Sequence, residues 1–188
     1  MSLTVEKCLQ AWTNSLSQMN ALADIVFFGD SLIYHGDFAS ALPNKVVCNL
    51  GLRGDTIQGM KNRVVQVKIL QPKTVYLMAG INDVASISAS DFYEQYESLI
   101  ILLREQNPNI ELIIFNMLPV DDVDFSISCN NEQIVRGNQI IASLCTKYGL
   151  CCVDLFAIYE QSGKLPKEMT LDGIHLFPKE YSRWYEVL

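Results

Sequence analysis

The sequence has no apolar run near the roughly 18 residues that a membrane-spanning helix needs, and residues 99–103 are typical of its longest runs. Its amino terminus also lacks the apolar segment of a secretory signal peptide. Basic residues are scarce, because 14 lysines and arginines stand against 21 acidic residues and leave a formal charge of −7. This charge argues against a nucleic-acid partner, whose phosphates need a basic surface. We expect a cytoplasmic protein without stable membrane insertion.

Cysteine patterns typical of metal sites are also missing. The six cysteines include no C-x-x-C pair, and no cluster of cysteine and histidine has the spacing of zinc ligands. We therefore predict reduced, mostly buried cysteines and no metal. With 188 residues, of which 49% are hydrophobic and 19% charged, the chain is long and apolar enough for one folded domain over 1–188.

Five short apolar segments, rich in β-branched and aromatic residues, predict strands. They cover 24–28, 45–48, 74–79, 111–116 and 150–154. Most are apolar at consecutive positions, which is typical of strands that are covered on both faces of a parallel sheet.

Segments with helical periodicity lie around these strands. They cover the residues before Asp24, 56–69, 90–105, 131–148 (followed by Gly149, a typical helix-ending glycine) and 178–187. The alternation predicts a parallel sheet with helices on both faces. The longest irregular segment, 119–130, carries three aspartates, and we interpret it as a solvated loop.

Polar residues follow four of the predicted strands. Ser31, within the run GDSL, follows the first strand, and Gly54 follows the second. Asn82 follows the third, while Asp172 and His175 come some way after the fifth. Ligands of open α/β sheets bind at the carboxyl ends of the strands, so we expect these residues to meet at one edge.

This set of groups is suited to acyl transfer. The Ser31 hydroxyl needs a base to act as a nucleophile, and an imidazole such as that of His175 exchanges protons near neutral pH. Asp172 can hold the ring in the correct tautomer. The Ser31 and Gly54 N–H groups and the Asn82 side chain can donate to an oxyanion, and a glycine at 54 lets the backbone approach the reacting carbonyl. We interpret Asp30 and Asp83, which adjoin these residues, as groups that order their loops.

Four sequence blocks resemble, in matching order, the motif blocks of the GDSL/SGNH hydrolase superfamily. They are GDSL at 29–32, the turn at Gly54, G-x-N-D at 80–83 and D-x-x-H at 172–175. The resemblance extends from about residue 25 to the last helix. It is strongest to bacterial platelet-activating-factor-acetylhydrolase-like and lysophospholipase-like esterases. It implies a three-layer α/β/α sandwich around a flavodoxin-like, five-stranded parallel sheet in the order 2-1-3-4-5.

The same resemblance implies the roles of the site residues. Ser31 is the nucleophile, His175 the base and Asp172 the carboxylate that orients it. Ser31, Gly54 and Asn82 form the oxyanion hole, and neither a metal nor a cofactor takes part.

Two residues depart from what we regard as typical of the family: His35, four residues after the serine, and Arg53, next to Gly54. Together with Leu118, they are our candidates for substrate binding. We expect a serine esterase that cleaves small esters with short acyl chains, such as acetyl, through an acyl-enzyme on Ser31. An O-acyltransferase with the same nucleophile and a non-catalytic binding domain on the same fold are the alternatives. The sequence leaves homo-oligomer formation open.

Overall fold

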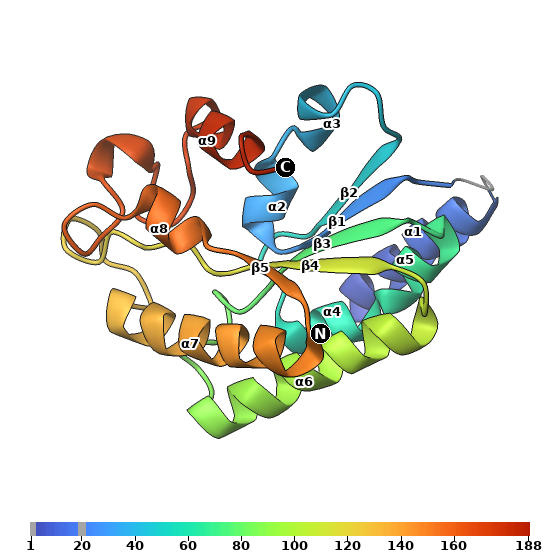
Figure 1. The fold of residues 1–188 in the computed structure, drawn as a ribbon, viewed down its shortest axis with the longest axis horizontal. Coiled ribbons are helices and arrows are strands. Elements are labelled where there is room, and N and C mark those ends of the chain that lie inside the picture. The colour runs from blue at the N-terminus through green and yellow to red at the C-terminus, as the bar shows by residue number, and fades with distance from the viewer. Residues whose placement is uncertain (1–2, 19–21) are drawn as a thin grey trace.

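The chain folds around a five-stranded sheet in which neighbouring strands are parallel (Figure 1). The computed structural model describes residues 3–18 and 22–188. Its strands are β1 (Ile25–Gly29), β2 (Val47–Gly51), β3 (Thr74–Met78), β4 (Glu111–Phe115) and β5 (Cys151–Val153). They lie in the order β2-β1-β3-β4-β5, so the predicted parallel sheet and its order are confirmed.

Helices cover both faces of the sheet, and Figure 1 shows the two layers on opposite sides of the strands. One layer packs on Val26 and Phe28 of β1 and the other on Ile25 and Phe27, because successive side chains of a strand point to opposite faces. The first layer holds α1 (Leu3–Gln18), α4 (Ile57–Asn62), α5 (Val64–Leu70), α6 (Ala89–Gln106) and α7 (Asn131–Tyr148). The second holds α2 (Ser31–His35), α3 (Phe38–Ala41), α8 (Leu155–Tyr159), α9 (Tyr181–Tyr185) and the 3₁₀ turns Lys167–Met169 and Pro178–Glu180. Among the described residues, no helix is long and apolar enough to span a bilayer.

The two longest helices of the first layer lie where the periodicity predicts them. Helix α7 spans 131–148 and ends at Gly149, whose φ of 62° is left-handed. Helix α6 extends one residue beyond 90–105 at each end, and the Ser88 side chain caps its first turn.

Two other predicted helices are wrong in their extent. The segment 56–69 is divided into α4 and α5 at Arg63, whose φ of −123° and ψ of 13° are not helical. The helix breaks there because the Arg63 side chain is buried beneath the sheet edge, where it binds backbone carbonyls of the strands. The predicted helix over 178–187 is a 3₁₀ turn over Pro178–Glu180 followed by the short α9, so i→i+3 hydrogen bonds replace the first turn of the expected helix.

Strand β2 runs to Gly51, three residues beyond the predicted end at 48. The polar Asn49 indicated a loop, but its side chain donates to two carbonyl oxygens of the α2 segment while its backbone stays in the strand. A β-carbon at Gly51 would overlap the backbone of Tyr34 in α2. Glycine at this position therefore lets α2, which begins with Ser31, pack directly on the strand end.

The cysteines are only partly buried. Cys129 and Cys145 are buried, Cys48 is half-buried, and Cys151 and Cys152 are exposed. The prediction of mostly buried cysteines is wrong for the last two because they lie in β5, an edge strand with a neighbour on one side only. The Cys8 side chain lies outside the described part of the chain.

Replacing Gly51 with alanine is expected to lower the free energy of unfolding by about 1–3 kcal/mol, because the new methyl group overlaps the backbone of α2. Urea unfolding measures this change. The control is Val46→Ala, at an exposed position just before β2, which should change stability by less than about 0.5 kcal/mol. An unchanged urea midpoint for Gly51→Ala would contradict the close packing described above.

Candidate active site

Ser31 is the first residue of α2 and follows β1 after one intervening residue. That residue, Asp30, caps the helix, because its Oδ1 accepts the Leu32 N–H at 2.9 Å. The Tyr181 hydroxyl donates to the Leu32 carbonyl at 2.8 Å and ties the same turn to α9. These contacts hold Ser31 at the carboxyl edge of the sheet, where only 6% of the residue is exposed.

His175 lies against Ser31, with its Nε2 2.8 Å from the serine Oγ. The other ring nitrogen, Nδ1, lies 2.7 Å from Asp172 Oδ2. With its proton on Nδ1, the ring donates to Asp172 and accepts the serine hydroxyl at Nε2. The structure thus brings together the three side chains that the sequence analysis expected to meet.

The pKa of Asp172 lies below its ordinary value. Partial burial raises the pKa, but the hydrogen bonds from the His175 backbone and ring and from the Ile174 N–H lower it by more. The carboxylate therefore stays ionised and can orient the ring.

Thr170 orders the loop that carries Asp172 and His175. It is buried, and its Oγ1 donates to the His175 carbonyl at 2.9 Å and accepts the Gly173 N–H at 2.9 Å. The Leu171 N–H donates to the same His175 carbonyl at 2.8 Å. Sequence reasoning missed Thr170, because a single threonine in a loop forms no motif, although its place two residues before an aspartate is compatible with a hydroxyl-closed turn.

The predicted solvated loop over 119–130 is confirmed for exposed residues such as Val123 and Asp124, but the prediction is wrong for Asp121. Asp121 is fully buried, and its Oδ1 lies 2.9 Å from Lys164 Nζ. The Asp121 N–H donates to the Gly173 carbonyl at 2.8 Å, so this segment braces the loop of His175. The prediction failed because the cation that pairs with Asp121 lies 43 residues further along the chain.

The three predicted oxyanion donors, Ser31 at the start of α2 and Gly54 and Asn82 in loops, follow strands β1, β2 and β3 at the same sheet edge. Among the described residues, the Ser31 and Gly54 N–H groups have no protein acceptor. The Asn82 amide donates one N–H to the Asp55 carbonyl at 2.8 Å, which leaves its second N–H for an oxyanion. Gly54 has a left-handed φ of 69° in a turn closed by the Asp55 N–H and the Leu52 carbonyl. A β-carbon there would meet no protein atom within 4 Å outside the adjacent residues, so the backbone conformation, rather than packing within the protein, requires glycine.

Arg63, which sequence reasoning missed, lies beneath these loops. Its guanidinium donates to the Gly29 carbonyl at 2.9 Å, to the Leu50 carbonyl at 2.8 Å and to Asp55 Oδ2 at 2.7 Å. It thereby joins the ends of β1 and β2 at the points where the two functional loops begin. A single arginine in a predicted helix that also carries Lys61 and Lys68 gave no signal of this role.

Asp30, Asp55 and Asp83 are buried carboxyl groups that interact through their charges, and the charge of Arg63 acts on Asp30 and Asp55. Burial raises the pKa of Asp30 to about 7 and that of Asp83 to about 6, and it raises the pKa of Asp55 despite the ion pair with Arg63. Asp83 accepts the Ile57 N–H and caps α4, in keeping with its predicted loop-ordering role. Among the described residues, no group of three or more His, Cys, Asp or Glu side chains is arranged to hold a metal ion.

The three predicted substrate-binding residues lie in different surroundings. His35 is exposed, and its ring centroid lies 5.6 Å from that of His175. Arg53 is exposed, and its Cζ lies 5.7 Å from the centroid of the Tyr34 ring. Leu118 is only 2% exposed and packs in the core beneath the second helix layer, because it follows β4 before the chain reaches the surface. The structure therefore gives Leu118 a packing position, in contrast to the prediction.

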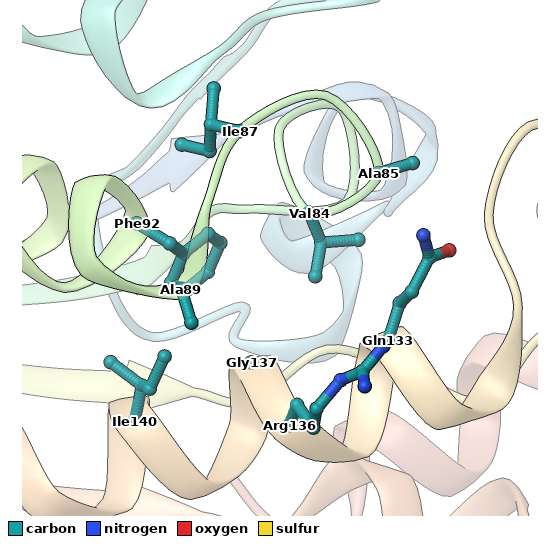
Figure 2. A pocket seen from close by; sticks show the side chains of 9 residues that line it. All are labelled: Val84, Ala85, Ile87, Ala89, Phe92, Gln133, Arg136, Gly137 and Ile140. Carbon is teal, nitrogen blue, oxygen red and sulfur yellow. The ribbon is translucent and has the colours of Figure 1, made fainter.

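A cavity of about 330 Å³ opens beside the segment that follows Asn82 (Figure 2). Its lining residues are Val84, Ala85, Ile87, Ala89, Phe92, Gln133, Arg136, Gly137 and Ile140. None of the predicted site residues lines it. The contact between Ser31 and His175 is thus separate from this cavity.

Replacing Asp30 with asparagine is expected to change the dependence of stability on pH. Folding raises the pKa of Asp30 from 3.8 to about 7. Between these values the unfolded state loses the Asp30 proton while the folded state keeps it, so the free energy of unfolding falls as the pH rises. The stability of the variant relative to the unaltered protein should increase between about pH 4 and 7 and then level off. Urea midpoints over this range measure the difference, with the exposed Glu168→Gln as control. Parallel curves for Asp30→Asn and the unaltered protein would refute this account of Asp30.

Solved structures with the same fold come from several bacteria. A provisionally named platelet activating factor from Streptococcus pneumonia shares 21% identity over 99% of this chain and 97% of that one, with a TM-score of 0.80. The lipase/acylhydrolase from Enterococcus faecalis shares 20% identity over 87% and 91%, with a TM-score of 0.73. An acetyl xylan esterase shares 21% identity over 87% and 98%, with a TM-score of 0.72. At these identities the likeness shows the fold.

Family membership rests on the sequence itself. No curated protein matches the chain. The model of the GDSL-like lipase/acylhydrolase family, however, matches residues 27–182, a span that includes Ser31, Asn82, Asp172 and His175. Since this match covers most of the chain, the protein belongs to the GDSL-like lipase/acylhydrolase family of esterases.

Proposed function

We propose that the protein is a serine esterase that hydrolyses small carboxylic esters through an acyl-enzyme on Ser31. The observation that carries this proposal is the continuous contact from Asp172 through His175 to Ser31, at 2.7 and 2.8 Å. The family supports the class of reaction, and the geometry supports these three residues as its catalytic groups.

The reaction proceeds in two steps. His175 Nε2 accepts the hydroxyl proton as Ser31 Oγ bonds to the ester carbonyl carbon. The carbonyl oxygen becomes an oxyanion, which the Ser31 and Gly54 N–H groups and the second amide N–H of Asn82 stabilise. The bond to the alcohol oxygen then breaks, and the alcohol takes the proton from His175. Water next gives a proton to His175 and attacks the acyl carbon. The bond between that carbon and Ser31 Oγ then breaks, the acid leaves, and His175 returns the proton to Oγ to restore the hydroxyl.

The openness of the site supports a short acyl chain. The side chains of His175 and Asp172 are 26% and 54% exposed. A site so open to water offers little apolar surface to a long chain, which therefore gains little from binding. The similar acetyl xylan esterase carries in its name the shortest of the acyl groups that we expect here.

Replacing Ser31 with alanine is expected to lower kcat for 4-nitrophenyl acetate by about a thousandfold or more, and His175→Ala should have a similar effect, because each removes the activated nucleophile. Asp172→Asn should cost about a hundredfold or more, since the ring loses the partner that fixes its tautomer. The control is Ser40→Ala, at an exposed position in α3, which should retain full activity. Near-native turnover by Ser31→Ala would contradict the proposal.

A series of 4-nitrophenyl esters from acetate to laurate tests the preference for short acyl chains. We expect kcat/KM to be highest for acetate to butyrate and to fall by about tenfold or more toward decanoate and laurate, because the long chains remain largely in water. A strong preference for decanoate and laurate would reject this part of the proposal and leave the nucleophile assignment intact.

A further inference from the structure

Within the part of the chain that the structure describes, Arg53 differs from the other arginines in having no oxygen partner. Arg63 pairs with Asp55, Arg136 with Glu132 and Arg183 with Glu180, while Arg104 donates to the Tyr148 carbonyl. Among the described residues, no carboxylate or carbonyl binds the Arg53 guanidinium, which is exposed and interacts with the face of the Tyr34 ring at 5.7 Å. The guanidinium therefore keeps its hydrogen-bond donors available to a ligand.

Arg53 is linked to the proposed catalytic residues both along the chain and through a series of ring contacts. Arg53 immediately precedes Gly54, whose N–H is a candidate oxyanion donor. The Tyr34 ring that it contacts lies 5.1 Å from the His35 ring, and the His35 ring lies 5.6 Å from that of His175. We call these three residues, Arg53, Tyr34 and His35, the cationic rim. Its His35 ring neighbours His175, the base of the proposed reaction.

The charge of the cationic rim resides on Arg53. Partial burial and the nearby charges of Arg53 and His175 lower the pKa of His35, while Asp172 opposes this to a smaller extent. His35 is therefore neutral near physiological pH and offers a hydrogen bond rather than a charge. Asp172, the carboxylate whose charge acts on His35, is already bound to the His175 ring.

We propose that the cationic rim binds an anionic group, a carboxylate or a phosphate, on the alcohol portion of the ester. This inference rests on the proposed function and adds a substrate class to it. In that reaction His175 gives its proton to the leaving alcohol, so the alcohol lies on the His175 side of Ser31. The His35 ring lies 5.6 Å from that of His175, and the charge of Arg53 acts on His35, so both residues neighbour the base on which the alcohol depends. A guanidinium in this position can bind both oxygens of an anion at once.

Because the protein as a whole is negatively charged, an unpaired cation beside the site indicates that the site binds an anion. With a net charge of −7, the surface as a whole repels anionic substrates. An unpaired arginine at the mouth of the site offsets this repulsion locally. A neutral ester needs no such group, so the arrangement favours an anionic ester over an uncharged one of the same shape.

Three acetyl esters of similar size test the proposal: 4-acetoxybenzoate, 4-acetoxyphenyl phosphate and the uncharged 4-acetoxybenzamide. Each kcat/KM is divided by the alkaline hydrolysis rate of the same ester, which removes differences between leaving groups. We expect at least one anionic ester to be favoured over the amide by about threefold to tenfold, and the favoured ester identifies the carboxylate or the phosphate as the better ligand. Added NaCl should reduce this ratio, because salt screens an exposed charge.

The variants assign the preference to Arg53. Arg53→Gln should abolish the preference, and Arg53→Lys should keep part of it, since an ammonium retains the charge but loses the two-pronged geometry. The control is Lys68→Gln, which removes the same charge from an exposed position near the end of α5 and should leave the ratio unchanged. Equal normalised kcat/KM values for the charged and uncharged esters, or an anion preference that remains in Arg53→Gln, would overturn the inference.

Product binding separates this inference from the proposed function. Calorimetric titration with 4-hydroxybenzoate, 4-hydroxyphenyl phosphate and 4-hydroxybenzamide measures the affinity of the rim without any turnover. An anion preference that is lost in Arg53→Gln supports the rim even if Ser31→Ala were to retain ester hydrolysis. Ser31-dependent hydrolysis without an anion preference in rates or binding would reject the rim and leave the esterase assignment standing.

Discussion

The hydrogen bond between Ser31 and His175 joins residues 144 positions apart, and the proposed chemistry depends on it. Neither residue could hold this position alone, because each lies in a loop or at the first residue of a short helix. On one side, the Asp30 cap and the Tyr181 hydroxyl fix the turn of Ser31. On the other side, the Thr170 hydroxyl forms hydrogen bonds within the loop of His175. The Asp121 N–H donates to the Gly173 carbonyl of the same loop. Separate sets of contacts thus support Ser31 and His175.

A buried guanidinium connects this support to the sheet. Burying a charge is costly unless its partners satisfy it, and Arg63 meets this condition with two strand carbonyls and the Asp55 carboxylate. Burial is the main cause of the raised pKa values of Asp30 and Asp83, and the negative charge of Asp55 raises both further. We infer that the buried acidic residues are unfavourable for stability. The Arg63 guanidinium that pairs with one of them also sets the relative position of the strand ends that carry the functional loops.

The parts of the fold that could be predicted are those that depend on local patterns. Alternation of apolar and helical segments predicted the parallel sheet, and the motif blocks identified Ser31, Asp172 and His175 as residues that meet. The contacts that could not be predicted are long-range and polar: Arg63 with the strand carbonyls, and Asp121 with Lys164. No periodicity marks the partner of a buried charge, so the break between α4 and α5 and the order of segment 119–130 became visible only in three dimensions.

The central claim is that His175 activates Ser31 as a nucleophile, and covalent labelling tests it most directly. A fluorophosphonate reacts with an activated serine and leaves a phosphonyl group on its oxygen. Intact-mass measurement followed by peptide mapping should find one adduct, on Ser31, and none in His175→Ala over the same time. Absence of an adduct on the unaltered protein, or an adduct on a different residue, would contradict the account.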